Sequence, residues 1–541
     1  MRGRAFGSRR LRICVALAGL GLLLAPAASA APFNPSPDAT WQTDGRVRSI
    51  LYVGNTVYIA GEFTQVVPPG GGTGVVRNHV AAFDVSSGQL LPWDPNADGI
   101  VWSLDVAGGL IYMGGEFANV GGVPRPFAAA VDGSTALVSA WNPIPDGNVN
   151  VVKVSPTGTI VLGGAFGKVG GKVRNSLAQV TTDGTVLQWN PSVKQVSGST
   201  CPPRCAPFVV SLAFSPDGTK LYFSGHFGLV GGVGRNNAAA VTFATAALLP
   251  WNPDVFGQGI GKNPNQANKV WKVELGPDRA FICGDFWSLD GFQRHPNLAA
   301  VDLTDGHLIP GFDATTDGNT PACLYRNGLL YIGGHFQYGG PNSAWVFIPG
   351  QKAELTGPGS QVRNHVAAVD GVTGAIDAWN PNADSVLGLH VLAQSPTQIA
   401  AGGDFTRIGG RDQAHLGLFS LDTTPPDTIL DTKPPAIANS AAASFAFHST
   451  EAGSSFVCSL DGVAATVCTS PVSLSGLADG VHSFSVAAID PAGNIDPTPA
   501  AYSWRIDTVA PGTPTGLTTT SVTASRVDLT WTAPPDPDVA S

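Results

Sequence analysis

Hydrophobic positions along this chain come in short runs that break at glycine. The run Leu110-Ile111-Tyr112-Met113, which stops at Gly114-Gly115, is typical. Short apolar or alternating runs bounded by glycine predict β-strands, whereas an amphipathic helix needs apolar residues every three to four positions over a longer stretch. No segment sustains that helical spacing, so the pattern predicts an all-β protein.

One phrase of this pattern recurs seven times within residues 31–422. An apolar strand ends in Gly-x-Phe, a Gly-Gly turn and an arginine follow, and a second strand of small residues comes next. The phenylalanines lie 49 to 69 residues apart and are Phe63, Phe117, Phe166, Phe227, Phe286, Phe336 and Phe405. A single sheet of about four short strands cannot bury both faces, but sheets stacked radially can. The repeat therefore predicts a seven-bladed β-propeller.

Most units close with an aromatic residue followed by Asn or Asp and Pro. Regular placement of these aromatics favours packing between blades over a sugar-stacking surface. The tryptophans concerned are Trp93, Trp141, Trp189, Trp251 and Trp379. The seventh unit stops at Asp422 without such a phrase, whereas Phe33-Asn34-Pro35 stands alone near the N-terminus. We expect this N-terminal strand to complete the last blade and so remove an open sheet edge.

The repeated phrase resembles a known bacterial repeat. The segments Gly402–Gly410 and Gly163–Asn175, with their Gly-Gly-x-Phe and Gly-Gly elements, are similar to delta-60 repeats. The resemblance covers residues 31–422 and implies a β-propeller of an exported or surface protein, without a defined activity. The first unit departs from the pattern in a Pro-Pro-Gly-Gly-Gly loop at 68–72, and the sixth carries an insertion at about 341–361.

The C-terminal part follows a different pattern. Residues 423–508 begin with a Thr/Pro-rich linker and resemble bacterial immunoglobulin-like modules through Phe456–Gly462, Gly476–His482 and Asp490–Asn494. Asp490 and Asn494 could bind calcium, but we favour a turn in which these side chains bond their own backbone. Residues 509–541 resemble the opening of a fibronectin type III domain. We expect that domain to be incomplete, because such a sandwich needs roughly 90–100 residues.

Residues 1–30 predict a cleaved export signal. Five arginines form a basic head, an apolar run follows from Ile13 to Leu24, and Ala28-Ser29-Ala30 supplies a cleavage site. Cleavage would change 30 basic and 39 acidic residues to 25 and 39, a net charge of −14. Such a charge argues against nucleic acid and anionic lipid as partners. We expect a secreted or cell-surface protein with no transmembrane segment after cleavage.

Six cysteines follow the signal, and an even number in an oxidising compartment predicts disulfide bonds. Cys201 and Cys205 share one loop, and Cys458 and Cys468 share one hairpin. Cys283 is left for Cys323. Because the pairs are scattered, they disfavour a zinc site, and we expect neither a metal nor another cofactor.

The candidate binding residues precede the motif phenylalanine. They are Glu62, Glu116, His226, Asp285, His335 and Asp404. These positions could line one face of the propeller. The interpretation we favour is that each acid braces the arginine after the turn of its own unit, as in Glu62/Arg77, Glu116/Arg125, Asp285/Arg294 and Asp404/Arg411. The arginines, which we expect to be structural, are Arg77, Arg125, Arg174, Arg235, Arg294, Arg363 and Arg411.

Known enzyme motifs are absent from the sequence: it has no G-x-S-x-G elbow, no H-E-x-x-H and no phosphate-binding loop. We predict no catalytic residue, and the sequence favours an exported binding or adhesion protein for a glycan or protein ligand. Two alternatives stay open: a polysaccharide hydrolase or lyase with accessory sandwich modules, and a structural component of the envelope. An asymmetric acidic pocket on one propeller face would favour an enzyme, and a flat aromatic face would favour glycan binding.

Overall fold

The computed structural model describes residues 33–534 apart from 196–205, 257–268, 292, 342, 349–350, 357–358 and 452. The predicted signal at 1–30 and the pair Cys201/Cys205 lie outside the described residues. All the elements assigned within those ranges are β-strands, as the hydrophobic pattern predicts. In the part of the chain that the structure describes, no helix has the length and apolarity needed to cross a membrane.

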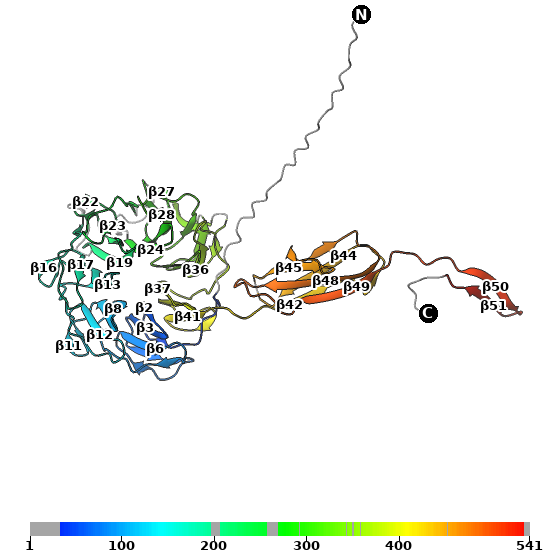
Figure 1. Ribbon diagram of the computed structural model, residues 1–541, viewed down its shortest axis with the longest axis horizontal. Coiled ribbons are helices and arrows are strands. Elements are labelled where there is room, and N and C mark those ends of the chain that lie inside the picture. The colour runs from blue at the N-terminus through cyan, green and yellow to red at the C-terminus, as the bar shows by residue number, and fades with distance from the viewer. Residues whose placement is uncertain are drawn as a thin grey trace, which may run out of the picture.

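Small antiparallel sheets surround a common centre and form a β-propeller (Figure 1). In the second repeat, β8 (Val101–Ala107) pairs with β9 (Leu110–Gly115), and β9 pairs with β12 (Ala128–Asp132). A hairpin of β10 (Asn119–Val120) and β11 (Val123–Pro124) connects β9 to β12 and contains the Gly-Gly turn. The order of strand, glycine turn and small-residue strand is the one that the repeated phrase predicts.

Within the described ranges, seven sheets share this inner, middle and outer order. The other six consist of β2 (Val47–Val53), β3 (Thr56–Gly61), β6 (Val80–Asp84) and β7 (Gln89–Leu90); β13 (Val149–Val154), β14 (Ile160–Gly164) and β17 (Leu177–Val180); β19 (Phe208–Phe214), β20 (Lys220–His226) and β23 (Ala238–Thr242); β24 (Lys269–Leu275), β25 (Arg279–Asp285) and β28 (Leu298–Asp302); β30 (Ala322–Arg326), β31 (Leu329–Gly333) and β36 (Val366–Asp370); β37 (Leu389–Gln394), β38 (Gln398–Gly403) and β41 (Leu416–Ser420).

Short strands around the ring form the outer hairpins and the sixth-unit insertion, and three of them add a third strand beside such a hairpin. They are β1 (Gln42–Thr43), β4 (Gln65–Val67), β5 (Val75–Val76), β15 (Lys168–Val169), β16 (Lys172–Val173), β18 (Val193–Lys194), β21 (Leu229–Val230), β22 (Val233–Gly234), β26 (Ser288–Leu289), β27 (Gln293–Arg294), β29 (Ala314–Thr316), β32 (Tyr338–Pro341), β33 (Ser343–Ile348), β34 (Gln351–Thr356), β35 (Gln361–Val362), β39 (Arg407–Ile408) and β40 (Arg411–Asp412).

The N-terminal segment completes the sheet of β41. In the second sheet a bridge from Val131 to Val138 represents a fourth strand beside β12. In the last sheet the corresponding bridge joins Leu421 to Phe33, and the Asn34 amide donates to the Ser420 carbonyl at 3.0 Å. The prediction that the N-terminus completes the last sheet is therefore confirmed.

The hydrophobic cores lie between neighbouring sheets. One core joins Tyr58 and Trp93 of the first sheet to Phe117 of the second, and another joins Leu418 of the last sheet to Phe83 of the first, which closes the ring. Burial of aromatic surface between sheets is a major source of stability for such a fold. The five tryptophans of the closing phrases are 1–7 % exposed, so they pack between sheets rather than forming a surface.

Two of the predicted disulfides are confirmed. The bond Cys283–Cys323 joins β25 to β30 of the next sheet, and both cysteines are buried. The bond Cys458–Cys468 joins the paired strands β45 (Ser455–Leu460) and β46 (Thr466–Cys468).

Residues after 427 form two facing sheets. Their core packs Phe445 and Phe447 of one sheet against Phe484 and Trp504 of the other. One sheet contains β42 (Thr428–Thr432), β44 (Ala443–Ser449) and β47 (Val472–Leu474); the other contains β43 (Ile437–Ala438), β49 (Ala500–Ile506), β48 (Gly480–Ile489), β45 (Ser455–Leu460) and β46 (Thr466–Cys468). An exposed hairpin of β50 (Thr515–Val522) and β51 (Val527–Thr532) follows.

The loop after β48 forms the turn that the sequence favours over a calcium site. The backbone amide of Asn494 donates to Asp490 Oδ1 at 2.7 Å, and its side-chain amide donates to Oδ2 at 2.8 Å. Asp422 and Glu451 bring carboxylate oxygens close to Asp490, within 4.8 Å of one another. Burial, followed by the charges of these two aspartates, raises the pKa of Glu451.

Candidate functional site

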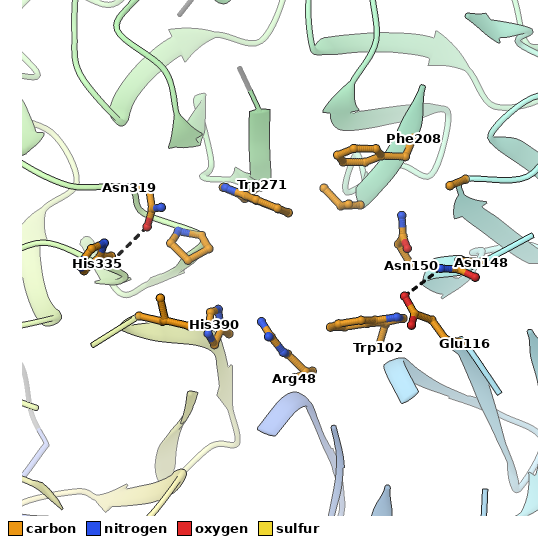
Figure 2. A pocket seen from close by; sticks show the side chains of 14 residues that line it. Arg48, Trp102, Glu116, Asn148, Asn150, Phe208, Trp271, Asn319, His335 and His390 are labelled. Carbon is orange, nitrogen blue, oxygen red and sulfur yellow. Dashed lines mark hydrogen bonds between the residues drawn. The ribbon is translucent and has the colours of Figure 1, made fainter. Parts of the chain in front are cut away.

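A pocket of about 580 Å³ lies at the centre of the ring of sheets (Figure 2). Its walls combine aromatic rings with amides and a few charged groups. All seven sheets of the described ring contribute lining residues: Arg48 from the first; Trp102 and Glu116 from the second; Asn148, Asn150 and Ala165 from the third; Phe208 and Val210 from the fourth; Trp271 from the fifth; Asn319, Pro321 and His335 from the sixth; Leu387 and His390 from the seventh.

A β-bulge in the inner strand explains how the sheets present these side chains. In β8, Val101 pairs with Gly115 and Ser103 pairs with Gly114, so Trp102 has no partner of its own. Such an extra residue lies outside the regular ladder, and its side chain is re-aimed. Six inner strands carry this bulge, and their bulge residues, which we call the bulge ring, are Arg48, Trp102, Asn150, Val210, Trp271 and His390.

All members of the bulge ring line the pocket and are half-buried. The residue before each of them is a Val or Leu with no exposed surface. Strand β30 pairs without a register shift, and Pro321 just before it takes the lining position. One place in the repeat therefore carries Arg, Trp, Asn, Val, Trp or His, whereas the motif Phe recurs in every unit. Loss of symmetry at one position of a symmetric scaffold is typical of a functional site.

The glycine of the Gly-x-Phe phrase allows the bulge to form. A Cβ at Gly115 would lie 2.2 Å from the carbonyl oxygen of Ile100, two residues before Trp102. Only glycine permits so close an approach of two backbones. The same Ile100 carbonyl accepts a hydrogen bond from the Glu116 amide at 2.8 Å. The residue before the motif Phe therefore stands beside the bulge.

The six candidate residues before the motif Phe differ in where they lie and in what they contact. Glu116 and His335 line the pocket. Glu62 and Asp404 lie behind it, bonded to arginines of the first sheet. His226 is buried, with its Nε2 2.9 Å from Gln195 Nε2. Asp285 pairs with Lys269 in the strand register. Neither His226 nor Asp285 is among the described residues that line the pocket.

Arg46 and Arg48 form an ionic network with Glu62 and Asp404. Arg46 Nε donates to Asp404 Oδ1 at 2.9 Å, and Arg48 Nε donates to Glu62 Oε1 at 2.7 Å. Burial raises the pKa of Asp404, but the hydrogen bond and charge of Arg46, together with the hydrogen bond from the Leu387 amide, leave that pKa below its usual value. The network joins the last sheet to the first and holds the Arg48 guanidinium at the pocket wall.

The predicted brace between acid and arginine within one unit is wrong at Glu62, Glu116 and Asp404. Glu62 and Asp404 bind the arginines of the network, and Glu116 Oε1 accepts from the Asn148 side chain at 2.8 Å. The Arg125 guanidinium instead donates to the carbonyls of Pro124 and Ser139. The acids bond residues at or just before the inner strands, whereas the arginines tie the outer hairpin to the closing phrase, so the two sets of groups have different partners.

Two of the seven predicted arginines occupy a different place from the others. Arg77, Arg125, Arg174, Arg235 and Arg363 donate their backbone amides to the residue after the motif Phe, and each bonds a carbonyl 13 or 14 residues further on. In the fifth and seventh units that backbone position belongs to His295 and Gln413. Arg294 stacks on Trp287 at 4.7 Å, and Arg411 donates to Ser36 at 3.1 Å.

Two tryptophans lie on opposite sides of the pocket, and Arg48 stands between Trp102 and His390 (Figure 2). The Arg48 guanidinium is 5.1 Å from the Trp102 ring centroid. Lys269 Nζ is 5.0 Å from the Trp271 centroid and 5.7 Å from that of Phe208. These contacts are within the range of cation–π attraction.

Electrostatics keep His390 neutral. Burial, followed by the positive charges of Arg48 and Arg46, lowers its pKa to about 3. A neutral imidazole has one donor and one acceptor nitrogen. Among the described lining residues Glu116 is the one carboxylate, and Asn148 already bonds it. The pocket wall thus offers mixed donors and acceptors with little net charge.

Sequence reasoning missed the bulge ring. In the sequence, each bulge residue directly follows a buried Val or Leu near the start of the inner strand. Examples are Asp98-Gly99-Ile100-Val101-Trp102 and Asp44-Gly45-Arg46-Val47-Arg48. Aligning these segments would have shown one column that varies among columns that recur. This variable position breaks the alternation of side chains along the strand, because the bulge inserts one extra residue into the strand.

Comparison with known proteins gives one family match. Residues 155–186, in the third repeat, match the family described as "Domain of unknown function (DUF5122) beta-propeller". No curated protein matches the chain.

Solved structures resemble the chain at low identity. The computationally designed Ika8 protein is 9 % identical, with 71 % of this chain and 100 % of that one covered and a TM-score of 0.37. The extracellular domain of a hybrid two component system from B. thetaiotaomicron is 9 % identical, with 85 % and 84 % covered and a TM-score of 0.24. YCF48 bound to D1 peptide is 13 % identical, with 74 % and 98 % covered and a TM-score of 0.37. At such scores no ligand or partner carries over to this chain.

Proposed function

We propose that this chain is an exported binding protein whose seven-bladed propeller holds an extracellular ligand in its central pocket. The observation that carries the proposal is the bulge ring: six equivalent positions converge on one pocket with five different residue types. A purely structural ring would repeat its residues, as the motif Phe does. The two disulfides and the predicted export signal support a location outside the cell.

The proposed binding residues are those that line the pocket and can contact a ligand there. Trp102, Trp271 and Phe208 supply apolar area, and Arg48, Glu116 and His335 supply polar groups. Glu62 and Asp404 are proposed to act indirectly, because they hold Arg48 and Arg46 in place. The immunoglobulin-like and fibronectin-like modules at 423–508 and 509–541 are proposed as spacers that present the propeller.

The pocket supports binding better than polysaccharide hydrolysis. Most glycoside hydrolases use two carboxylates that face each other across the scissile bond, at about 5–10 Å. Glu116 is the carboxylate of the described pocket wall, while Glu62 and Asp404 are occupied by arginines. A binding protein needs no such pair.

The test is binding of the full secreted chain to glycan arrays, to whole cells and to extracellular proteins, before and after changes to the pocket. A combined Trp102→Ala and Trp271→Ala variant should lose whichever interaction the wild type shows. Trp287→Ala is the matched control, since Trp287 is also half-buried and lies in the same sheet unit as Trp271 but outside the pocket. Unchanged binding by a folded pocket variant would disprove the proposal.

A further inference from the structure

We infer that the ligand is an uncharged pyranose sugar, or the end of a neutral glycan, held between Trp102 and Trp271. This inference rests on the proposed function and names the chemistry of its ligand. Three properties of the pocket lead to it: the placement of the aromatic rings, the balance of charge, and the mixture of hydrogen-bonding groups.

The aromatic rings suit a flat ligand with apolar faces and polar edges. Trp102 and Trp271 lie on opposite sides of the pocket, and Phe208 adds a third ring (Figure 2). A pyranose presents C–H groups on its faces and hydroxyls around its edge, so its faces can cover aromatic surface while its edge remains polar. The volume of about 580 Å³ is within the range of about 300–1,000 Å³ for small-ligand pockets. A protein ligand would have to insert a single side chain or loop.

The charges disfavour a cationic ligand. An aromatic pocket that binds a quaternary ammonium needs ring faces free of other cations. Here Arg48 is 5.1 Å from the Trp102 centroid, and Lys269 is 5.0 Å from that of Trp271. A ligand cation between the two rings would find each ring already in contact with a cationic side chain.

The charges also disfavour an anionic ligand. Arg48 is paired with Glu62, and Arg46 is paired with Asp404, so neither arginine brings an unbalanced charge. The Glu116 carboxylate lies in the pocket wall beside Trp102 and would repel a uronate or sialate group (Figure 2). A neutral ligand avoids both penalties.

The polar groups match hydroxyls. Three side-chain amides, from Asn148, Asn150 and Asn319, line the wall together with Glu116 and the neutral imidazole of His390. Amides and neutral imidazoles both donate and accept, and so does a hydroxyl, whereas a carboxylate only accepts and an ammonium only donates. A ring bearing several hydroxyls is the ligand that can use such a mixture on all its edges.

The experiment titrates three classes of probe into the full secreted chain by calorimetry and tryptophan fluorescence. The probes are neutral gluco-, galacto- and manno-oligosaccharides, uronate oligosaccharides, and choline. We expect one neutral series to bind, with uronates and choline weaker by at least about tenfold, which is about 1.4 kcal/mol. Binding should change the tryptophan fluorescence, because both rings contact the ligand.

Substitutions then locate the site. Trp102→Ala and Trp271→Ala should each weaken the neutral sugar at least about tenfold, as expected for buried aromatic contacts. Trp102→Phe and Trp271→Phe should recover part of that loss, which guards against variants that simply fail to fold. Trp287→Ala should bind as the wild type does. Glu116→Gln should strengthen uronate binding relative to neutral-sugar binding.

The outcomes separate this inference from the proposed function. If a uronate, choline or a protein binds, and its binding depends on Trp102 and Trp271, the neutral-sugar inference is wrong while the central pocket remains the binding site. If a neutral sugar binds but the tryptophan substitutions leave its affinity unchanged, the inference is also wrong. If no interaction of the chain depends on the bulge ring, both fail.

Discussion

Phe33 forms an antiparallel bridge with Leu421, so the first described residue of the chain joins the end of the last propeller sheet. Its ring is 2 % exposed and lies edge-on to Tyr331 of the preceding sheet, with 6.0 Å between centroids. Arg326 covers the same ring at 4.9 Å. One residue thus closes the last sheet and seals the core between the last two sheets.

Replacing Phe33 should destabilise the propeller as a whole. Phe33→Ala removes a buried ring from that core, and such substitutions cost about 3–5 kcal/mol. The propeller transition in calorimetry should shift to lower temperature. Leu137→Ala removes a side chain that is 71 % exposed and should leave the transition where it is. An unshifted melting temperature for Phe33→Ala would show that the N-terminal segment does not close the ring.

Loss of Asp404 should weaken the network behind the pocket by a modest amount. Asp404→Asn leaves Arg46 with Glu62 as its ionic partner, at 3.4 Å. Because the Arg46 and Asp404 side chains are 30 % and 19 % exposed, we expect a loss of about 1–2 kcal/mol, between exposed and buried pairs. Asp94→Asn, at a longer 3.7 Å contact with Arg77, should cost less. Chemical denaturation measures both, and equal costs would contradict the network's role.

Loss of the disulfide between Cys283 and Cys323 should lower the stability of the propeller. Cys283 and Cys323 are 40 residues apart, and closing a loop of that length restricts the unfolded chain by an amount worth about 4 kcal/mol. A Cys283→Ala/Cys323→Ala variant should therefore melt at a lower temperature than the wild type. The double Cys458→Ala/Cys468→Ala variant should shift the melting transition of the two sheets after residue 427 and leave that of the propeller unchanged. The opposite assignment of the two transitions would refute this prediction.

His390 should make the propeller less stable in mild acid. Its pKa is about 3 in the folded state and near 6.5 when unfolded, so between these values the unfolded chain binds the extra proton. The free energy of unfolding must then fall as the pH falls through this window, by up to about 1.4 kcal/mol per pH unit. His390→Gln removes this contribution, so its melting temperature should depend less on pH between about 7.5 and 5. Most carboxyls titrate below this range. Parallel curves for variant and wild type would mean that His390 takes up its proton in both states.

The sequence predicted the parts of the molecule that repeat. The motif Phe and its glycine recur because each sheet needs the same buried ring and the same close approach of two backbone segments. The pattern that contains Phe117 and Gly115 is therefore visible seven times in the sequence. Arg294 and Arg411 were matched by residue type, although the backbone position belongs to His295 and Gln413. A histidine or glutamine at that position has no visible likeness to an arginine. Only the hydrogen-bond register reveals the equivalence.

The pocket was missed because its lining residues, unlike the motif Phe, differ in type from unit to unit. Trp102 and Trp271 are not among the five tryptophans of the closing phrases, so the repeat predicts no role for them. Their role depends on a register shift in the inner strand, which the alternation of apolar and polar residues does not encode. The pairing of Glu62 with Arg48, rather than with Arg77, likewise depends on which strand lies innermost.

The register shift also separates two kinds of change that a repeat protein can undergo. A bulge residue forms no rung of the ladder, so exchanging its side chain leaves the neighbouring backbone pairs, Val101 with Gly115 and Ser103 with Gly114, intact. Duplication of a unit can therefore copy the architecture faithfully while six wall positions diverge independently. A library randomised at Arg48, Trp102, Asn150, Val210, Trp271 and His390 would therefore sample new ligand specificities while the backbone pairing of the sheets is retained. Each of these sheets would contribute one variable residue to the pocket.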